Sequence, residues 1–590
     1  MNRYWALVLA SVFLLSLLRW RDRVSYLRYL RDLHRGPVSL RCRVISDALP
    51  FERSIDALCS HAKFRLFFKG ATPPLEYGDV VKVKGVAFVP VDYRNPGSFS
   101  VVDAMDREGV ALFVKVRRWR VLSKGKGPMT LLHRLRMRLV AFAMGLDSPF
   151  RGFVLATVLG EKGLVEERSV FYRLGLGHIL AVSGLHLGIF IFVLYWLFRW
   201  LLRPVNLAVG FPFLLLPRRL AHLFVLALVP VLVVLAGEGI PVIRAALMYG
   251  AYVLFGVFLE RDVELVNLVL LVLLIFVLLV PYQLASVGFQ YTFLAVLLLG
   301  LVEQRLRGSS RLVRSLAASS VLPLALLPVS AYHFHRVYLL GSFFNVILLP
   351  VFSILVALVF VFFWCGYLLG GPFLYVLQLL GSLYTSLLGL MRMVASVPGI
   401  WMEADRATFT LLLGLSFLLA ALLGVRLLYF LAVFCFLASL YLFYQQSRDR
   451  VVFFDMGRAG DATLVVLDGR AYLVNAGGRG REGAKALYQA LVWEGVKRID
   501  RLICALKGRV GTAYVGYLRR RMDVRATEGC DGLWEGRCRP FKLGPVSLVC
   551  RKEDCKKGPC KVLGDGVFVG GRWLEPWRVG AIKVYLEGAR

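Results

Sequence analysis

The sequence predicts a polytopic α-helical membrane protein of about 10–11 spans, with a small OB-like β-barrel domain before the spans and an α/β domain after them. The first observation behind this prediction is composition. Of the 590 residues, 58% are hydrophobic and the mean hydropathy is +0.66, whereas soluble domains are usually about 45–50% apolar. The second is a series of apolar runs that fills residues 177–446. The third is the charged, strand-like sequence on both sides of that series.

The chain opens on a short apolar segment, residues 4–18. A helix needs roughly 17–25 apolar residues to cross a bilayer, so this segment is short for a full span. No small-residue cleavage signature follows it. We therefore predict that residues 1–19 are an N-terminal membrane anchor rather than a removable signal peptide.

Residues 20–125 are predicted to form the OB-like barrel. Short runs that alternate polar and apolar residues begin near positions 39, 63, 80 and 111, which is the pattern of strands with one buried face. Four or five such strands suit a small closed barrel, and OB barrels bind single-stranded nucleic acid through basic and aromatic side chains. The candidate DNA-binding residues are basic side chains of the last two runs: Lys82, Lys84, Arg117, Arg118 and Arg120.

Residues 126–176 are predicted to be amphipathic helices that lie at the membrane surface. Their basic face gathers His133, Arg134, Arg136 and Arg138, while leucines occupy the opposite face.

Residues 177–446 are predicted to be the polytopic membrane domain. Its apolar runs cover residues 179–201, 220–236, 243–259, 265–281, 288–303, 316–332, 343–363, 373–397, 408–424 and 427–444. Residues 205–216 are too short to span and are expected to be re-entrant. The positive-inside rule places the basic loops at 199–219 and 305–314 in the cytoplasm. Strict alternation of the spans then places both flanking domains outside the cytoplasm.

The charge distribution indicates a polyanionic partner. The chain has 72 Lys and Arg against 38 Asp and Glu, a formal net charge of +34. Residues 20–150 hold 24 basic and 12 acidic side chains, and residues 447–590 hold 28 and 16. Such an excess is expected of a domain that binds nucleic acid or anionic lipid, and a solvated basic surface is the alternative. In the second region the candidate DNA-binding residues are Arg519, Arg520 and Arg521.

Most of the cysteines lie in the two flanking domains: Cys42 and Cys59 in the first, and Cys504, Cys530, Cys538, Cys550, Cys555 and Cys560 in the second. Outside the cytoplasm, disulfides are their expected fate. A zinc knuckle is the alternative, and it would lack histidine, since none follows His335. No metal site and no cofactor are predicted.

One polar motif stands at the start of the membrane domain. Residues 177–188 place two histidines and a serine among glycines and apolar residues. If the helix continues through Gly184, Ser183 and His186 share a face and His178 lies two turns from His186. Ionisable residues within a span tend to face a bundle interior or a water-filled path. Helix packing through small and polar residues is the plain alternative.

This motif and the order of blocks after it resemble the ComEC family of bacterial competence proteins. The segment HILAVSGLH at 178–186 is similar to the family's hallmark, and PVIRAALM at 241–248, GFQYTFLA at 288–295 and YHF at 332–334 look like further family blocks. The resemblance spans nearly the whole chain and implies a membrane path for incoming single-stranded DNA. The path residues that it implies are His178, Ser183, His186, Arg244, Gln290, His333 and Asn345.

The last domain, residues 447–590, departs from the family pattern. Family members usually carry a metallo-β-lactamase-like nuclease domain there, and FDMGRAGDA at 454–462 is similar to its first turn. Asn475 stands where the family usually has aspartate, and residues 504–511 read CALKGRVG where a His-rich metal motif is expected. Binuclear hydrolysis needs imidazole and carboxylate ligands. We therefore predict a degenerate, non-nucleolytic domain that is retained as a basic, DNA-facing module.

The resemblance thus implies a non-enzymatic inner-membrane channel that imports single-stranded DNA during natural transformation. The implied partners are the DNA strand, the lipid bilayer, a DNA receptor protein, a separate nuclease and a cytoplasmic ATPase motor, since the sequence has no P-loop of its own. Two alternatives stay open. An intramembrane serine hydrolase would use Ser183 with His186, and a translocase would carry anionic lipid or polysaccharide.

Overall fold

In the computed structural model the chain forms two compact units. The first comprises Met1–Val89, Met105–Leu324 and Tyr338–Trp401, and the second Pro90–Ala104, Ala325–Val337 and Met402–Arg590. The structure describes residues 3–33, 35–70, 72–180, 182, 184–209, 216–261, 265–338, 341–397, 402–423, 428–457, 460–478, 480–506, 512–530, 541–543, 546–549, 560–562, 567–569, 572–574 and 582–585.

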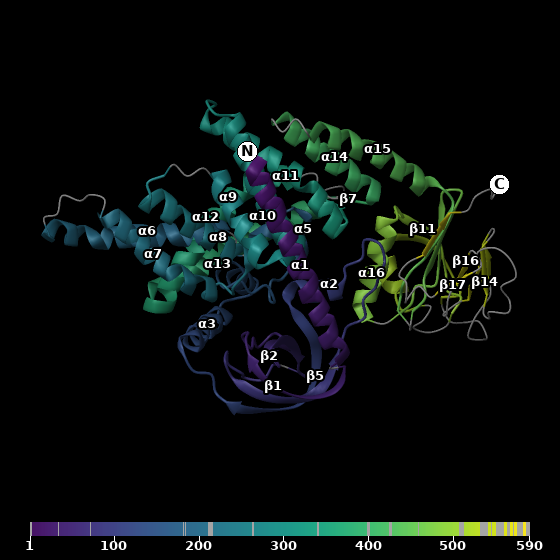
Figure 1. The fold of residues 1–590 in the computed structure, drawn as a ribbon, viewed down its shortest axis with the longest axis horizontal. Helices are drawn as coiled ribbons and strands as arrows, with labels where there is room; N and C mark the ends of the chain where they lie inside the picture. Colours follow the sequence, from purple (N-terminus) through teal and green to yellow (C-terminus); the bar gives the residue numbers. More distant parts are fainter. Residues whose placement is uncertain are drawn as a thin grey trace. The chain divides into compact units, whose positions relative to one another are not determined.

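In the first unit, helix α1 (Arg3–Leu33) joins the predicted anchor and the basic segment after it into one continuous helix. It packs beside α9 (Leu265–Leu279) and against the barrel strand β5 (Val110–Ser123) (Figure 1). Near its end, the buried Arg31 donates to the Asp106 carboxylate and to two backbone carbonyls of β5. Helix α1 therefore connects the barrel to the membrane helices of this unit.

Five strands close into the predicted small barrel, in the order β1-β2-β3-β5-β4. The remaining strands are β1 (Gly36–Val44), β2 (Ser54–Cys59), β3 (Ala62–Phe67) and β4 (Val80–Phe88). Sequence analysis missed β2, because Leu58 places an apolar side chain on the exposed face and hides the alternation. Cys42 and Cys59 stand opposite each other in β1 and β2 and form a disulfide inside the barrel.

The helices after the barrel differ from the expected surface helices. They are α3 (Pro128–Met144), α4 (Phe150–Val158) and α5 (Arg168–Arg173). All but one residue of α4 is buried, and Phe153 stacks on Tyr384 at 4.4 Å between ring centroids. Two residues of the predicted basic face, His133 and Arg136, are also buried. That prediction was wrong for these two side chains, because carboxylates distant in sequence contact them inside the unit.

Seven described helices are long and apolar enough to cross a membrane, and three shorter apolar helices accompany them. The chain is thus a multi-pass membrane protein. The seven are α7 (Leu216–Leu235), α8 (Ile240–Tyr252) with its continuation η2 (Val253–Phe258), α10 (Val287–Arg305), α11 (Arg311–Phe334), α12 (Gly341–Leu369), α13 (Pro372–Ala395) and α15 (Leu428–Ser447). The shorter ones lie in α6 (Gly184–Val209), α9 and α14 (Arg406–Leu422).

Each of the ten predicted apolar runs lies on one of these helices. The expected re-entrant segment is not a separate element in its first part, because residues 205–209 continue α6; residues 210–215 lie outside the described residues. Two short elements, η1 (Gly177–Leu180) and η3 (Pro281–Ala285), lie between described helices of the first unit. Helix α2 (Val101–Glu108) lies between the barrel strands β4 and β5.

The second unit is built on a six-stranded sheet in the order β12-β11-β10-β9-β8-β18. Its strands are β8 (Arg450–Phe453), β9 (Thr463–Leu467), β10 (Arg470–Val474), β11 (Arg498–Ile503), β12 (Asp523–Glu528) and β18 (Ile582–Tyr585). The sequence pattern does not predict β9, whose five residues lie between two glycine- and aspartate-containing turns. The register makes β8, β10, β11 and β12 parallel to one another, so their carboxyl ends share one edge.

Helix α16 (Gly480–Trp493) and helix α18 (Val515–Arg519) supply apolar side chains to the core beside this sheet. Helices α14 and α15 lie side by side in the same unit (Figure 1). Smaller sheets complete it: β6 (Arg336–Val337) pairs with β7 (Met402–Glu403), and a five-stranded sheet contains β13 (Phe541–Leu543), β14 (Val546–Val549), β15 (Cys560–Val562), β16 (Val567–Val569) and β17 (Arg572–Leu574).

Candidate functional site

The outer surface of the barrel carries a row of cations that crosses three strands. Along β4, inward and outward residues alternate, so that Lys82 and Lys84 both point outward. Lys82 stands in register between Arg41 of β1 and Arg120 of β5, and Lys84 stands opposite Arg118. We call the exposed set the cationic face; it consists of Arg41, Arg43, Lys82, Lys84, Lys115, Arg118 and Arg120.

The cationic face lacks a neutralising carboxylate within the described part of the chain. None of its seven side chains forms an ion pair with any residue that the structure describes. On β3, by contrast, Lys63 and Arg65 each lie 2.7 Å from a carboxylate oxygen of Asp56. Like charges opposite each other destabilise a sheet, so the cationic face has a cost that a polyanionic ligand would offset.

Arg117 occupies a different position from its neighbours. The register between β4 and β5 shifts between Lys84 and Gly85, and Arg117 is the extra residue of that bulge. Gly85 permits the close approach there, since a Cβ at this position would lie 2.4 Å from the Lys115 carbonyl oxygen. Arg117 is exposed beside the cationic face but has no partner in register on β4.

Aromatic rings continue the same outer surface at one end of the cationic face. Phe88 stands opposite Phe113, with ring centroids 6.0 Å apart, and Phe67 lies 5.1 Å from Phe113. Phe88 is 37% exposed, so its ring is available for base stacking. The sequence pattern did not identify Arg41, Arg43, Lys115 or the paired rings of Phe88 and Phe113 as candidate binding residues. The alternation of Arg41 and Arg43 about Cys42 was the signal that could have identified the first two.

A second candidate site lies among the membrane helices of the first unit. Arg244 in α8 is fully buried, and its Nη2 donates to the Gly288 carbonyl oxygen at 2.9 Å and to Thr292 Oγ1 at 2.6 Å. Its guanidinium carbon lies 5.8 and 5.6 Å from the ring centroids of Phe289 and Phe293. A snorkelling arginine would reach solvent or headgroups. Because Arg244 is fully buried, it lies inside the helix bundle instead.

The helices that carry His186 and Gln290 pack against the helix of Arg244. Helix α8 contacts both α6 and α10, and the nearest neighbour of a Cβ at Gly184 would be Ala245, at 3.5 Å. His186 is buried in the first turn of α6. Gln290 Nε2 donates to the Leu284 carbonyl oxygen at 3.3 Å. The structure therefore brings these three predicted path residues onto neighbouring helices.

The other predicted path residues are placed differently. His178 lies in η1 and is exposed, and it does not share a helix with His186, because α6 begins only at Gly184. The condition for a shared face, a helix that continues through Gly184, is therefore not met. Ser183 lies outside the described residues, and for Asn345 the structure describes the backbone, within α12, but not the side chain. His333 ends α11 and belongs to the second unit.

In the second unit, Arg519, Arg520 and Arg521 are exposed and held by local contacts. Arg519 Nη2 donates to Thr527 Oγ1 at 2.5 Å, and Arg520 Nε donates to the Gly516 carbonyl oxygen at 3.0 Å. Arg521 lies over the Tyr517 ring, 5.7 Å from its centroid. Arg519 ends helix α18, and Arg520 and Arg521 follow it. None of the three lies on a strand, whereas the cations of the barrel do.

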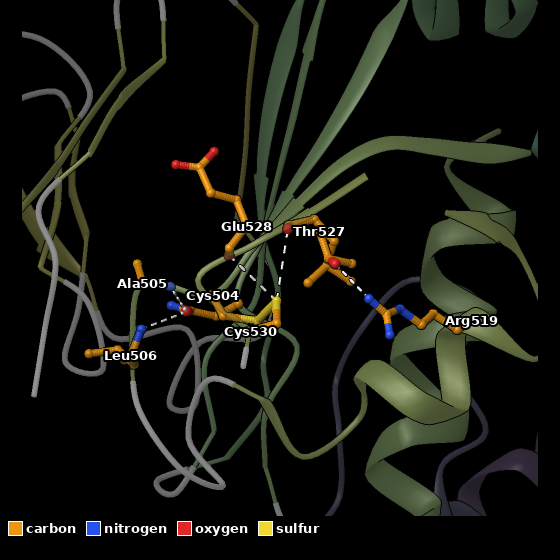
Figure 2. Close-up of a disulfide and its surroundings, with 9 residues drawn as sticks. Cys504, Ala505, Leu506, Arg519, Thr527, Glu528 and Cys530 are labelled. Atoms are coloured by element: carbon orange, nitrogen blue, oxygen red, sulfur yellow. Dashed lines mark hydrogen bonds between the residues drawn. A yellow bond between two sulfur atoms is a disulfide. The ribbon is translucent and has the colours of Figure 1, made fainter. Parts of the chain in front are cut away.

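A disulfide joins the ends of β11 and β12, between Cys504 and Cys530 (Figure 2). The backbone N–H groups of Ala505 and Leu506 both donate to Asn475 Oδ1, at 2.8 and 3.0 Å. Asn475 has a φ of +60°, a conformation that asparagine tolerates better than most residues. Of the other candidate cysteines, Cys560 lies in β15 with its side chain undescribed, and Cys538, Cys550 and Cys555 lie outside the described residues.

The turn after β8 binds a segment of the same unit, Pro90–Ala104. Asn95 Nδ2 donates to the Asp455 carbonyl oxygen at 2.9 Å, and the Asp455 N–H donates to Asn95 Oδ1 at 2.7 Å. Burial raises the pKa of Asp455 above its ordinary value, although N–H groups of Gly457 and Arg94 donate to its carboxylate. Among the described residues, no three His, Cys, Asp or Glu side chains gather where they could hold a metal ion.

Comparison with known proteins gives the following similarities. Residues 157–440 match the family model described as Competence protein. ComE operon protein 3 of Bacillus subtilis (strain 168) is 26% identical over 285 residues, which are 47% of this chain and 35% of that protein. The chain therefore aligns with about a third of the length of this curated relative. No solved structure matches the chain.

Proposed function

Since residues 157–440 carry the competence-protein domain of the ComEC family, we propose that this multi-pass membrane protein is an inner-membrane channel that imports single-stranded DNA during natural transformation. Its membrane helices provide the path, and its flanking domains receive the strand. In this proposal the other components of the competence machinery are a DNA receptor, a nuclease and a cytoplasmic ATPase motor.

The observation that carries the proposal is the cationic face of the barrel. Seven exposed cations on β1, β4 and β5 have no acidic partner among the described residues, and the exposed ring of Phe88, packed against Phe113, adjoins them. Proteins that bind single strands without sequence preference combine a basic surface that follows the backbone with aromatic platforms for the bases.

The disulfides support an extracytoplasmic position for both flanking domains. The barrel contains Cys42–Cys59, and the sheet of the second unit contains Cys504–Cys530. Disulfides persist in oxidising compartments and are rare in the cytoplasm. A strand that arrives from outside would then meet the cationic face before it meets the membrane helices.

The proposed channel has no nuclease activity of its own. Residues 504–511 lack the histidines that a binuclear metal site needs. The described start of this segment, residues 504–506, is held by the Cys504–Cys530 disulfide and by the Asn475 side chain, which supports a structural role for this edge of the sheet.

Binding of single-stranded DNA to the full chain in detergent tests the role of the cationic face. Lys82→Gln with Arg120→Gln removes two adjacent cations, so the slope of log affinity against log salt should fall by about 1.4. Arg53→Gln with Lys69→Gln changes the net charge equally, at exposed positions outside β1, β4 and β5, and should leave most of the slope.

Equal losses in the two double variants would contradict a specific face. Tighter binding of the wild-type protein to anionic vesicles than to DNA, reduced by the Lys82 and Arg120 changes, would instead favour the translocase for anionic lipid.

A further inference from the structure

Arg244 differs from the other buried arginines of the described chain. Arg31 lies 2.6 Å from Asp106, Arg136 contacts both Asp47 and Glu161, and Arg450 lies 3.7 Å from Glu494. Arg244 is equally buried, yet no described carboxylate lies within ion-pair distance of it. Its Nε and Nη1 have no hydrogen-bond partner in the described part of the chain.

A buried cation without a counter-ion is costly. Removing a guanidinium from water is unfavourable unless its charge is paired and its N–H groups are satisfied. Two oxygen acceptors and the faces of Phe289 and Phe293 compensate Arg244 in part. The N–H groups of Nε and Nη1 remain without an acceptor among the described residues. Ionisable groups of this kind within a span mark binding sites and pathways.

The contacts of Arg244 lead to the start of α10, where a second positive feature lies. Its two acceptors, Gly288 and Thr292, belong to the first turns of that 19-residue helix. A helix N-terminus has the positive end of the helix dipole and favours anions. Gly288 is exposed, and a Cβ at this position would meet no atom within 4 Å. The helix start is therefore open on one side.

We propose that Arg244 and the first turn of α10 form a binding site for a phosphodiester anion in the membrane core, which the strand in transit contacts. This inference rests on the proposed function. In the present conformation the free N–H groups are covered by protein, so the anion reaches them only when α8 and α10 move apart. Phosphate oxygens then replace the Gly288 and Thr292 oxygens as acceptors, and charge-assisted hydrogen bonds favour that exchange.

The test measures whether the Arg244 charge and the phosphate charge are coupled. Cells of the source organism carry the wild-type protein or a variant and are given labelled duplex DNA. One DNA has an ordinary backbone, and the other has a central methylphosphonate block in both strands. We expect the wild-type protein to import the neutralised DNA roughly tenfold more slowly, the effect of one charge-assisted hydrogen bond. Arg244→Gln should lose this discrimination, and Arg244→Lys should keep most of it.

Thr292→Val distinguishes an anion site from a structural clamp. This variant removes one acceptor of Arg244 but keeps the guanidinium, so the preference for ordinary DNA should persist. The proposal is overturned if Arg244→Gln discriminates as the wild-type protein does, or if it slows both DNAs in equal proportion, as loss of a clamp or of a lipid headgroup contact would. If wild-type cells import no more DNA than deletion cells, the proposed function itself fails.

Discussion

Asp47 is a residue on which three parts of the first unit converge. Its Oδ1 lies 2.9 Å from His133 Nδ1, and its Oδ2 accepts a hydrogen bond from Arg136, which also binds Glu161. The His133 ring stacks on Tyr77 at 4.0 Å between centroids. Burial by itself would raise the pKa of Asp47, but the hydrogen bond with His133 and the charge of Arg136 hold it below its ordinary value.

Replacement of this carboxylate should be strongly destabilising. Asp47→Asn leaves Arg136, whose side chain is 2% exposed, with one of its two counter-charges. We expect a loss of about 3–5 kcal/mol, the typical cost of breaking a buried ion pair, measured by denaturant unfolding of the full chain in detergent. Glu76→Gln is the matched control, because its partner Arg134 is on the same helix but exposed; it should cost at most about 1 kcal/mol. Equal effects would refute the assigned role.

The buried carboxyl group of Asp79 predicts that the stability of the fold depends on pH. Its side chain is fully buried, which would raise its pKa, but the Gly125 and Glu76 N–H groups and Lys124 Nζ donate to it at 2.8–3.1 Å. The net result is a pKa below the ordinary value. A lowered pKa stabilises the fold above the ordinary value, roughly pH 4, and this stability is lost as pH falls through the folded-state pKa. Asp79→Asn should therefore flatten the acid limb of the stability profile. An unchanged acid limb would contradict this.

At the residue scale, sequence alone could identify Arg244 and Gln290 as polar residues within spans. It could not identify the environment of His133 and Arg136. Helical periodicity placed both on one polar face, correctly, but it carries no information on which face is covered. The carboxylates that cover them come from positions 47 and 161, and only the fold brings these together.

Among the elements, the barrel has the clearest functional surface. Phe88 extends it with an exposed ring opposite Phe113. Phe88→Ala should weaken binding of single-stranded DNA by about 1–3 kcal/mol, the usual contribution of one stacked base. Leu131→Ala on α3 is the control, since Leu131 is 65% exposed but lies outside the barrel strands, and it should leave affinity unchanged. Anisotropy titrations of the full chain would measure both, and an equal loss would refute the stacking role.

The disulfide at the end of β11 predicts a stability effect (Figure 2). Cys504 and Cys530 are separated by 26 residues, and a cross-link that closes such a loop stabilises by about 3.5 kcal/mol in the chain-entropy account. Cys504→Ala with Cys530→Ala should lower the unfolding midpoint of the second unit. Cys365→Ala, at a free cysteine, is the control. A midpoint unaffected by the double change would contradict the cross-link.

At the scale of elements, composition and periodicity predicted the ten apolar helices and four of the five barrel strands. They missed β2 and β9, because these strands are short and interrupted by an exposed Leu58 or enclosed by turns. They left open whether a helix continues through Gly184, where the structure begins α6. Whether a helix begins at a glycine depends on tertiary packing, which periodicity does not contain. Here a Cβ at Gly184 would meet Ala245 of another helix.

For the whole molecule, the ordered series of polar blocks was informative from sequence, and the match of residues 157–440 to the competence-protein model confirms it. The net charge, by contrast, could not predict which cations lack an acidic partner, because it does not tell which acidic side chains the fold brings near them. The barrel shows that they are absent on β1, β4 and β5 and present beside β3.

The whole chain is also expected to lack nuclease activity. The purified full chain should not cleave single-stranded DNA in the presence of Mg²⁺, Mn²⁺ or Zn²⁺, because the loop after β11 has no histidine to hold an ion. A gel assay with labelled DNA measures this. Cleavage that a chelator abolishes, and that persists through successive purification steps, would refute the proposed loss of nuclease activity.

The most direct test of the central claim is deletion of the gene in the source organism, scored by the transfer of labelled DNA into the cytoplasm. If the protein is the channel, DNA should still bind to the cells, but the label should stay outside the cytoplasmic membrane, and a plasmid copy of the gene should restore transfer. Normal transfer of label in the deletion strain would contradict the account.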